Sequence, residues 1–395
     1  MRNIVLITLE SVRADHCSFM EYERNTTPFL NQKIKEANAI VFENAISSGT
    51  YTSESMISLF TGDFSYIVPD NPGAKLSPEP WRKEIKKRKT LAQFFSKNGY
   101  RTIGFNTNPL TSAYYGYDKG FHIFRDLLKR SSSIPFVSVW EYTTPWENYY
   151  DQIIQEVKKS KDPFFLWIFP TETHAPYITG RSDKWSSSTD KIKVILDKIF
   201  SIAGNKTKIN LYNDCIRYID SFIERLYYDL KEFNPIFIVH ADHGEGFGEH
   251  NFYRHGSDNF YEELIHIPLV VINTSVNERL RKPFSLSDLN DWITGIDTPI
   301  SNLSLPNGND WALSKTFDSN WIRACTRTED YKFIYRPNGT DEFYNLKRDP
   351  SEKNSEMGKT PEIEKKLRRM LEEEINRDKE KIRIKNKISS IKGKD

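Results

Sequence analysis

The sequence predicts an α/β fold in which helices pack on a large, mostly parallel sheet. Short apolar runs typical of buried strands alternate along the chain with segments of helical periodicity, as expected when helices join parallel strands. The expected strands are residues 4–8, 100–105, 164–169, 236–240 and 269–272. The expected helices are residues 52–61, 90–98 and 211–232.

The carboxyl-terminal part of the chain has a different pattern. Residues 332–335 and 342–344 are strand-like and flank a turn at 337–339, which predicts an antiparallel hairpin. From Thr360 the chain reads as a charged helix with a Lys-rich tail. We therefore expect a main α/β domain over residues 1–310, a smaller antiparallel sheet over 311–358, and a charged helix and tail over 359–395. The polar segments 63–88 and 183–208 are expected to be a surface excursion and a flexible insertion.

Composition restricts the function classes. The chain has 395 residues, and its 56 basic and 54 acidic residues leave a net charge of +2, which gives no argument for nucleic acid or an anionic membrane as partner. Three widely spaced cysteines argue against a disulfide framework and fit a reducing compartment. We find neither a secretory signal nor an apolar run of about 20 residues, so a cytoplasmic protein without a membrane span is expected.

Two expected strands end in side chains that suit a metal. Residues 236–240 run into Asp242 and His243, with glycines at 244, 246 and 248 that allow a tight turn, and residues 4–8 run into Glu10. Carboxylate and imidazole together suit a hard-to-borderline divalent cation. One metal site at one sheet edge is therefore predicted. Taken singly, Glu10 could be a helix cap or surface acid, and Asp242 with His243 a buried ion pair.

Six segments in the same order resemble the sulfatase family of the alkaline phosphatase superfamily, whose fold combines a large mostly parallel sheet with a smaller carboxyl-terminal antiparallel sheet and a terminal helix. They are TLESVRADH (8–16), SSGTYTSESMISLFTG (47–62), THAPY (173–177), ADHGEGFGEH (241–250), HGSDNFYEELIHIPLVV (255–271) and YKFIYRPNGTDEFYNLKRDPSEKN (331–354). The resemblance covers nearly the whole chain and implies a divalent metal, such as Zn, Mn, Ca or Mg, with a nucleophile in contact with it.

This chain departs from the formylglycine sulfatases at the nucleophile. Counting back from Thr61-Gly62 puts Thr52 in the nucleophile position, where the aldehyde is made only from Cys or Ser, and Glu54 and Met56 replace the Pro and Arg of the modification signal. Glu10-Ser11 also replaces the adjacent Asp pair of calcium-type sulfatases. These changes resemble phosphoryl-transferring relatives such as lipoteichoic acid synthases and phosphoethanolamine transferases.

The resemblance assigns a role to each candidate residue. Glu10, Thr52, Asp242 and His243 would hold the metal, and Thr52, His174 and His255 would be catalytic. The two histidines would also bind substrate or a second metal, although both could be structural. Arg13 is either a local ion pair with Asp15 or a substrate contact, and Asn108 could reach substrate. Thr52 could also be an ordinary helix N-cap, and Thr50 and Ser53 compete with it for both roles.

The leading hypothesis is a metal-dependent hydrolase of phosphate or sulfate esters, with phosphoesters or phosphodiesters favoured and a small-molecule or glycan-type anionic ester as substrate. Phosphoryl transfer to an alcohol acceptor is one alternative. A second is a catalytically inactive binding protein that retains the fold. A third is a cofactor-independent phosphomutase or a nucleotide pyrophosphatase. The sequence does not indicate the oligomeric state.

Overall fold

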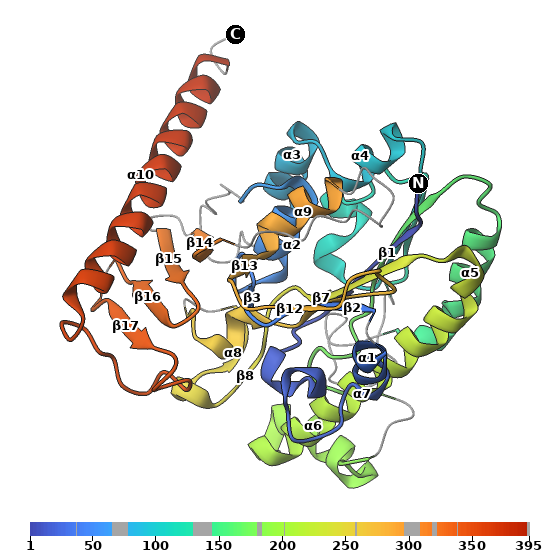
Figure 1. Ribbon diagram of the computed structural model, residues 1–395, viewed down its shortest axis with the longest axis horizontal. Helices are drawn as coiled ribbons and strands as arrows, with labels where there is room; N and C mark the ends of the chain where they lie inside the picture. The colour runs from blue at the N-terminus through green and yellow to red at the C-terminus, as the bar shows by residue number, and fades with distance from the viewer. Residues whose placement is uncertain are drawn as a thin grey trace.

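The computed structural model describes residues 1–36, 38–64, 78–128, 144–179, 184–200, 202–256, 259–295, 309–317, 322–337 and 339–392. A central eight-stranded sheet has the order β12-β2-β11-β7-β1-β6-β4-β5 (Figure 1). Its strands are β1 (Ile4–Leu9), β2 (Ala39–Phe42), β4 (Arg101–Asn106), β5 (Ile123–Asp126), β6 (Phe164–Phe169), β7 (Ile236–Ala241), β11 (Leu269–Ile272) and β12 (Glu278–Leu280).

The sheet is mostly parallel, as predicted. Strand β1 pairs in parallel with β6 on one side and β7 on the other, whereas β11 is antiparallel to both its neighbours. Every residue of β1, β6 and β7 is buried, which explains why these strands read as continuous apolar runs rather than as alternating patterns. The carboxyl ends of β7, β1, β6 and β4 therefore meet at one edge of the sheet.

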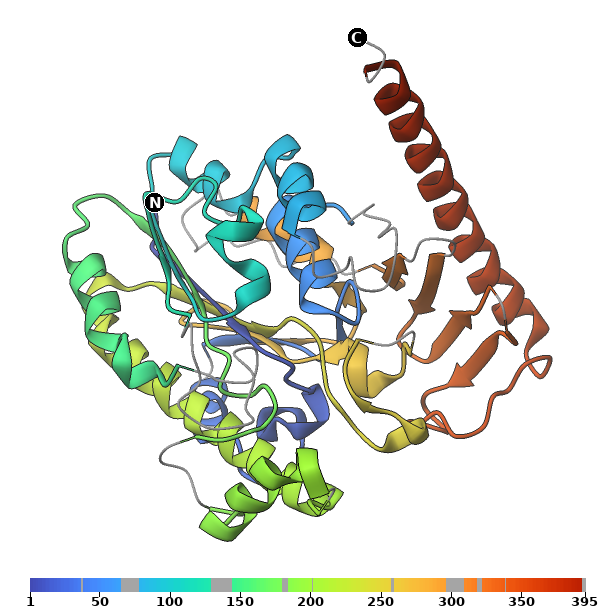
Figure 2. The same ribbon diagram turned by 180° about the vertical axis from the view of Figure 1, so that it is seen from behind.

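Helices cover both faces of this sheet. They are α1 (Pro28–Lys35), α2 (Thr52–Thr61), α3 (Pro78–Lys87), α4 (Leu91–Lys97), α5 (Tyr150–Lys158), α6 (Ser188–Phe200), α7 (Asn205–Asp229), α8 (Glu262–Ile265) and α9 (Leu286–Thr294). Helices α2, α3, α4 and α9 lie on one side, and α1 and α7 on the other (Figures 1 and 2). Two small sheets lie beside them, one of β3 (Ala45–Ile46), β10 (His266–Ile267) and β13 (Phe284–Ser285), the other of β8 (Gly246–Phe247) and β9 (Tyr253–Arg254).

The carboxyl-terminal part is an antiparallel sheet covered by a long helix. Its strands are β14 (Ala312–Phe317), β15 (Ile322–Arg327), β16 (Tyr331–Tyr335) and β17 (Glu342–Asn345), in chain order. The predicted hairpin is confirmed as β16–β17. Helix α10 (Pro361–Lys392) buries Leu367, Leu371 and Ile375 against Phe333 and Phe343 of this sheet, and its last turns extend beyond the sheet (Figure 1).

Two predictions about loops are wrong in part. Within 63–88, residues 78–87 form helix α3, which buries Trp81 and Ile85 on one face, while 65–77 lie outside the described residues. Within 183–208, helix α6 and the start of α7 replace most of the expected flexible insertion. Both segments were misassigned because their few apolar residues are spread among charged ones. No helix in the described part of the chain is long and apolar enough to cross a membrane.

Candidate metal and nucleophile site

Strand register brings the first two candidate ligands together. Leu9 of β1 pairs with Ala241 of β7, so Glu10 and Asp242 leave the sheet side by side at its carboxyl edge. Both carboxyl groups and the imidazole of His243 are buried, and one ligand atom from each lies within 4.8 Å of the others. The structure therefore assembles the three residues that the sequence predicts as metal ligands.

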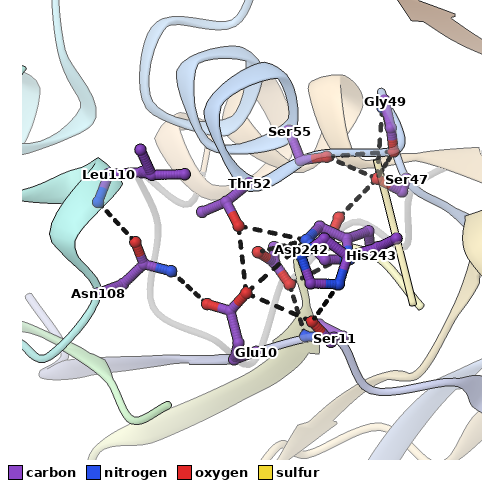
Figure 3. Close-up of polar contacts among 12 residues, drawn as sticks. Glu10, Ser11, Ser47, Gly49, Thr52, Ser55, Asn108, Leu110, Asp242 and His243 are labelled. Carbon is purple, nitrogen blue, oxygen red and sulfur yellow. Dashed lines mark hydrogen bonds and ion pairs between the residues drawn. The ribbon is translucent and has the colours of Figure 1, made fainter. Parts of the chain in front are cut away.

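Thr52 completes this group from the other direction. It is the first residue of α2, and its Oγ1 atom lies 3.2 Å from Glu10 Oε1 and 3.2 Å from His243 Nε2 (Figure 3). The N-cap residue of α2 is Tyr51, so Thr52 is not the N-cap. A hydroxyl in the first helical turn lies where the helix dipole favours negative charge.

The protonation of His243 follows from its hydrogen bonds. Its Nδ1 lies 2.8 Å from the carbonyl oxygen of Gly244, which accepts only if Nδ1 carries the proton. The lone pair of Nε2 then points toward Glu10, Thr52 and Asp242, because Nε2 is 3.8 Å from Glu10 Oε1 and 3.4 Å from Asp242 Oδ2. A backbone carbonyl that fixes the tautomer in this way is the usual support of a metal-binding histidine.

One oxygen of Asp242 has no hydrogen-bond donor in the described structure. Its Oδ1 accepts hydrogen bonds of 2.9 Å from the backbone amides of Ser11 and His243, but no described group donates to the buried Oδ2. Leaving a buried carboxylate oxygen without a donor or cation is costly. Four ligands at about 2.0–2.2 Å from a tetrahedral cation lie about 3.3–3.6 Å apart, close to the separations among Thr52, Glu10, His243 and Asp242. The residues present therefore fit a divalent cation.

The two buried carboxyl groups of Glu10 and Asp242 also favour a bound cation. Burial and the nearby Asp242 carboxylate raise the pKa of Glu10 well above its usual value, against hydrogen bonds from Asn108 and Thr52 that lower it. Two adjacent buried carboxyl groups repel when both are ionised, and a cation between them removes that repulsion. Asn108 donates its side-chain amide to Glu10 Oε2, so the structure places it beside the predicted ligand Glu10 (Figure 3).

His174 and His255 lie on the same site. Their ring centroids are 5.2 Å apart, that of His255 is 4.4 Å from His243, and both histidines have a nitrogen within 4.8 Å of a Glu10 oxygen. Burial and the neighbouring His255 lower the pKa of His174 to about 4, which keeps that ring neutral. Glu10 therefore belongs to two groups of possible metal ligands, one with Asp242 and His243 and one with the two histidines.

Sequence reasoning missed Glu245. This buried carboxylate lies 3.3 Å from Nδ1 of His255. Burial lowers the pKa of His255, but the carboxylates of Glu245 and Asp242 raise it, and the net shift is upward. An acid three residues after Asp242 in a glycine-rich loop was a visible signal, yet the loop conformation that turns it toward His255 could not be predicted.

Arg13 occupies the first of its two expected roles. Its guanidinium forms salt bridges with Asp15 at 2.7 Å and Glu249 at 2.8 Å and donates to the carbonyl oxygen of Glu245. These contacts fix the loop after β1 to the loop after β7. Arg13 therefore supports the loops that carry the site.

Comparison with known proteins assigns the chain to a family. The family Sulfatase matches residues 2–296, and the chain belongs to it. This confirms the family that the sequence motifs predict. Among curated proteins, phosphoethanolamine transferase EptA of Helicobacter pylori is 22% identical over 300 residues, which cover 72% of this chain and 49% of the relative. The chain thus spans about half the length of that relative.

Solved structures share the fold. A 2-O GAG sulfatase superposes with a TM-score of 0.73 at 15% identity, covering 97% of this chain and 93% of that one. Phosphonate monoester hydrolase of Agrobacterium radiobacter superposes with a TM-score of 0.69 at 14% identity, covering 96% of each chain. The alkaline-phosphatase-like fold predicted from the sequence is confirmed by these neighbours together with the observed sheets.

Proposed function

We propose that this chain is a metal-dependent phosphoester hydrolase in which Thr52 is the nucleophile. The observation that carries the proposal is the position of Thr52 Oγ1, 3.2 Å from both Glu10 Oε1 and His243 Nε2 and in the first turn of α2. A divalent cation held by Glu10, Thr52, Asp242 and His243 would lower the pKa of the Thr52 hydroxyl and offset the charge of the ester oxygens.

The residues of the chain define the rest of the reaction. Thr52 Oγ1, ionised by loss of its proton to solvent, attacks phosphorus, the bond to the leaving alcohol breaks, and a threonyl phosphate forms. The leaving oxygen takes a proton, for which the imidazolium of His255, stabilised by Glu245, is well placed. Neutral His174 carries its proton on Nδ1, which lies 2.8 Å from the carbonyl oxygen of Ala175, so the lone pair of its Nε2 suits a second cation beside the ester rather than a hydrogen bond to an ester oxygen. Water then gives a proton to the now neutral His255 and attacks the threonyl phosphate, which releases phosphate and restores Thr52 in its ionised form.

Two features favour phosphate over sulfate. Thr cannot be converted to formylglycine, the group on which the sulfatase reaction of this family depends. The second acid of the calcium-type pair is Ser11, whose backbone amide donates to Asp242 instead of contributing a negative charge. A site with fewer carboxylates is less repulsive toward a doubly charged phosphate ester.

Transfer to an alcohol acceptor is the second candidate. It is favoured by the sequence similarity to a phosphoethanolamine transferase. Hydrolysis and transfer share the threonyl intermediate and differ only in whether water or an alcohol attacks it. Added glycerol or a sugar alcohol should therefore divert product from free phosphate to a new phosphoester if the enzyme is a transferase.

The test is an activity panel of aryl phosphate, phosphodiester, phosphonate ester and aryl sulfate, each with Mn²⁺ or Zn²⁺. We expect turnover of phosphate esters, loss of turnover in Thr52→Ala, and partial retention in Thr52→Ser. Ser53→Ala, one residue along the same helix, is the matched control. Mass spectrometry of quenched wild type should find phosphate on Thr52. Full activity of Thr52→Ala, or turnover of aryl sulfate alone, would exclude the proposal.

A further inference from the structure

The short helix α8 lies between the central sheet and the carboxyl-terminal sheet (Figures 1 and 2). It comprises only Glu262–Ile265. Its backbone contacts the loops that carry the candidate site, and its first side chain contacts the carboxyl-terminal sheet. It is therefore a physical link between the two parts of the molecule.

The backbone of α8 contacts both the loop that carries His243 and the loop that leads to Thr52. The carbonyl oxygen of Leu264 accepts the amide of Gly244 at 2.8 Å, and that of Ile265 accepts the amide of Ser47 at 2.8 Å. Gly244 is packed so closely that a Cβ atom there would lie 2.0 Å from the carbonyl oxygen of Glu263. Gly244 fixes the ring of His243, and Ser47 begins the loop that leads to Thr52. A shift of α8 would therefore move a metal ligand and the nucleophile together.

The side chain of Glu262 anchors α8 in the carboxyl-terminal sheet. Lys332 Nζ lies 2.9 Å from Glu262 Oε1 and 2.6 Å from Glu352 Oε1, and Glu352 Oε2 accepts the backbone amide of Glu262 at 2.7 Å. Arg327 adds a contact of 3.2 Å to Glu262 Oε2. Lys332 is 0% exposed and Glu352 is 1% exposed, so this network is shielded from solvent.

A second contact restrains the same helix. The imidazole of His250 lies 2.7 Å from Glu263 Oε1 and 3.1 Å from the carbonyl oxygen of Glu352. Its ring stacks on Tyr261 at 3.6 Å between centroids. Buried ion pairs add little net stability but restrict geometry, because each partner leaves its position only at the cost of an uncompensated charge. The network thus suits a positioning role better than a merely stabilising one.

We propose that Lys332, together with Glu262 and Glu352, is a positioning residue that sets α8, and through it His243 and Thr52, in the arrangement that binds the metal. The carboxyl-terminal sheet is then part of the support of the active site. The effect on turnover rests on the proposed function, whereas the effects on local structure and metal affinity do not.

The test compares two charge-balanced double variants. Lys332→Met with Glu352→Gln removes one charge of each sign beside α8. Lys315→Met with Asp378→Asn does the same to a buried pair of the same subdomain, whose 2.7 Å contact joins β14 to α10 without contacting α8. Hydrogen exchange at the Gly244 and Ser47 amides, Mn²⁺ or Zn²⁺ affinity and the kinetic constants are measured for both.

Only the Lys332 and Glu352 double variant should affect the site. Exchange at Gly244 and Ser47 should rise by about tenfold or more over the control, metal affinity should fall by about tenfold, and kcat should fall with KM nearly unchanged. If the double variant does not fold, Glu352→Gln alone should show the same changes at smaller size. Equal local exchange and metal affinity in the two double variants would overturn the proposal. Exchange and metal affinity need no substrate, so an inactive wild type would refute only the proposed function.

Discussion

The hydroxyl of Ser47 lies 2.5 Å from the carbonyl oxygen of Asp242 and 2.7 Å from the hydroxyl of Ser55, so one buried side chain joins the end of β7 to helix α2 (Figure 3). Ser47 can donate to the carbonyl and accept from Ser55 at the same time. The proposed metal ligand Asp242 and the helix of the proposed nucleophile Thr52 therefore share a direct hydrogen-bonded connection in addition to the one through α8.

Replacing Ser47 with alanine should cost both stability and activity. Ser47→Ala leaves the Asp242 carbonyl without this donor, and we expect the free energy of unfolding to fall by about 1–3 kcal/mol. Thr52 should lose its fixed distance from His243, and kcat should fall by about tenfold. Chemical denaturation and steady-state kinetics measure the two effects. Ser58→Ala is the control, because Ser58 is also a buried serine, lies in α2 and donates to Ser48 at 3.0 Å. An equal loss of kcat in both variants would count against a specific role for Ser47.

Replacing Asp242 with asparagine should preserve the stability of the metal-free protein but remove the stability gained from metal. In Asp242→Asn the metal-free protein should be as stable as wild type or more so, because the variant loses the repulsion that raises the pKa of Glu10. Wild type should gain about 2.7 kcal/mol when the metal concentration is about 100-fold above Kd, and the variant should gain little. Thermal unfolding with and without Mn²⁺ or Zn²⁺ tests this.

The control for that experiment is Asp220→Asn. Asp220 is also a buried acid, but it accepts the backbone amides of Phe29 and Leu30 at the start of α1. Its variant should keep the whole metal-dependent gain. A full gain in Asp242→Asn would instead place the metal elsewhere.

The sequence predicted an element correctly where a continuous apolar run marked a strand, and it predicted correctly which side chains meet where residues follow the ends of parallel strands. Residues 4–8, 164–169 and 236–240 are strands because uninterrupted apolar runs suit a sheet buried on both faces, and Glu10 and Asp242 meet because parallel strands end at one edge. Thr52 was placed by its distance from Thr61-Gly62, and the structure brings it into contact with both strand ends.

Sequence reasoning failed where backbone geometry or long-range contacts decided the outcome. Glu245 turns toward His255 only because of the path of its loop. Lys332 reads as an ordinary strand residue, yet its side chain is buried between Glu262 and Glu352. Glu262 is the first residue of α8 and Glu352 lies in the loop after β17, so the sequence does not indicate that they meet. Helices α3 and α6 were missed because Pro, Lys and Ser residues dominate their segments and hide apolar positions such as Trp81 and Ile85.

Acid should destabilise the fold through buried His240. Burial lowers its pKa to about 4, and its two ring nitrogens contact Thr8 Oγ1 at 3.0 Å and the carbonyl oxygen of Ala241 at 2.9 Å. The unfolded chain binds this proton near pH 6.5, so the stability present above about pH 6.5 is lost as pH falls toward about 4.

His240→Gln isolates this contribution. Its loss of unfolding free energy between about pH 7.5 and about pH 5 should be smaller than that of wild type by about 1–2 kcal/mol. Urea titrations of both proteins at the two pH values give the comparison. An identical loss in both would assign the acid sensitivity to other groups, of which His16 has a similarly lowered pKa of about 4, through burial and Arg13.

Replacing Glu245 with glutamine should shift the pH dependence of turnover. Burial lowers the pKa of His255 and the Glu245 carboxylate raises it, so removing that carboxylate lowers the pKa. If His255 donates its proton to the leaving oxygen, activity falls as pH rises through this pKa, and in Glu245→Gln the fall begins at lower pH. Rate profiles of kcat against pH measure the shift, with Glu249→Gln as control because Glu249 contacts Arg13 and the Phe247 amide rather than His255. An activity that instead falls as pH decreases would make His255 a neutral ligand, and Glu245 would then serve to orient its ring.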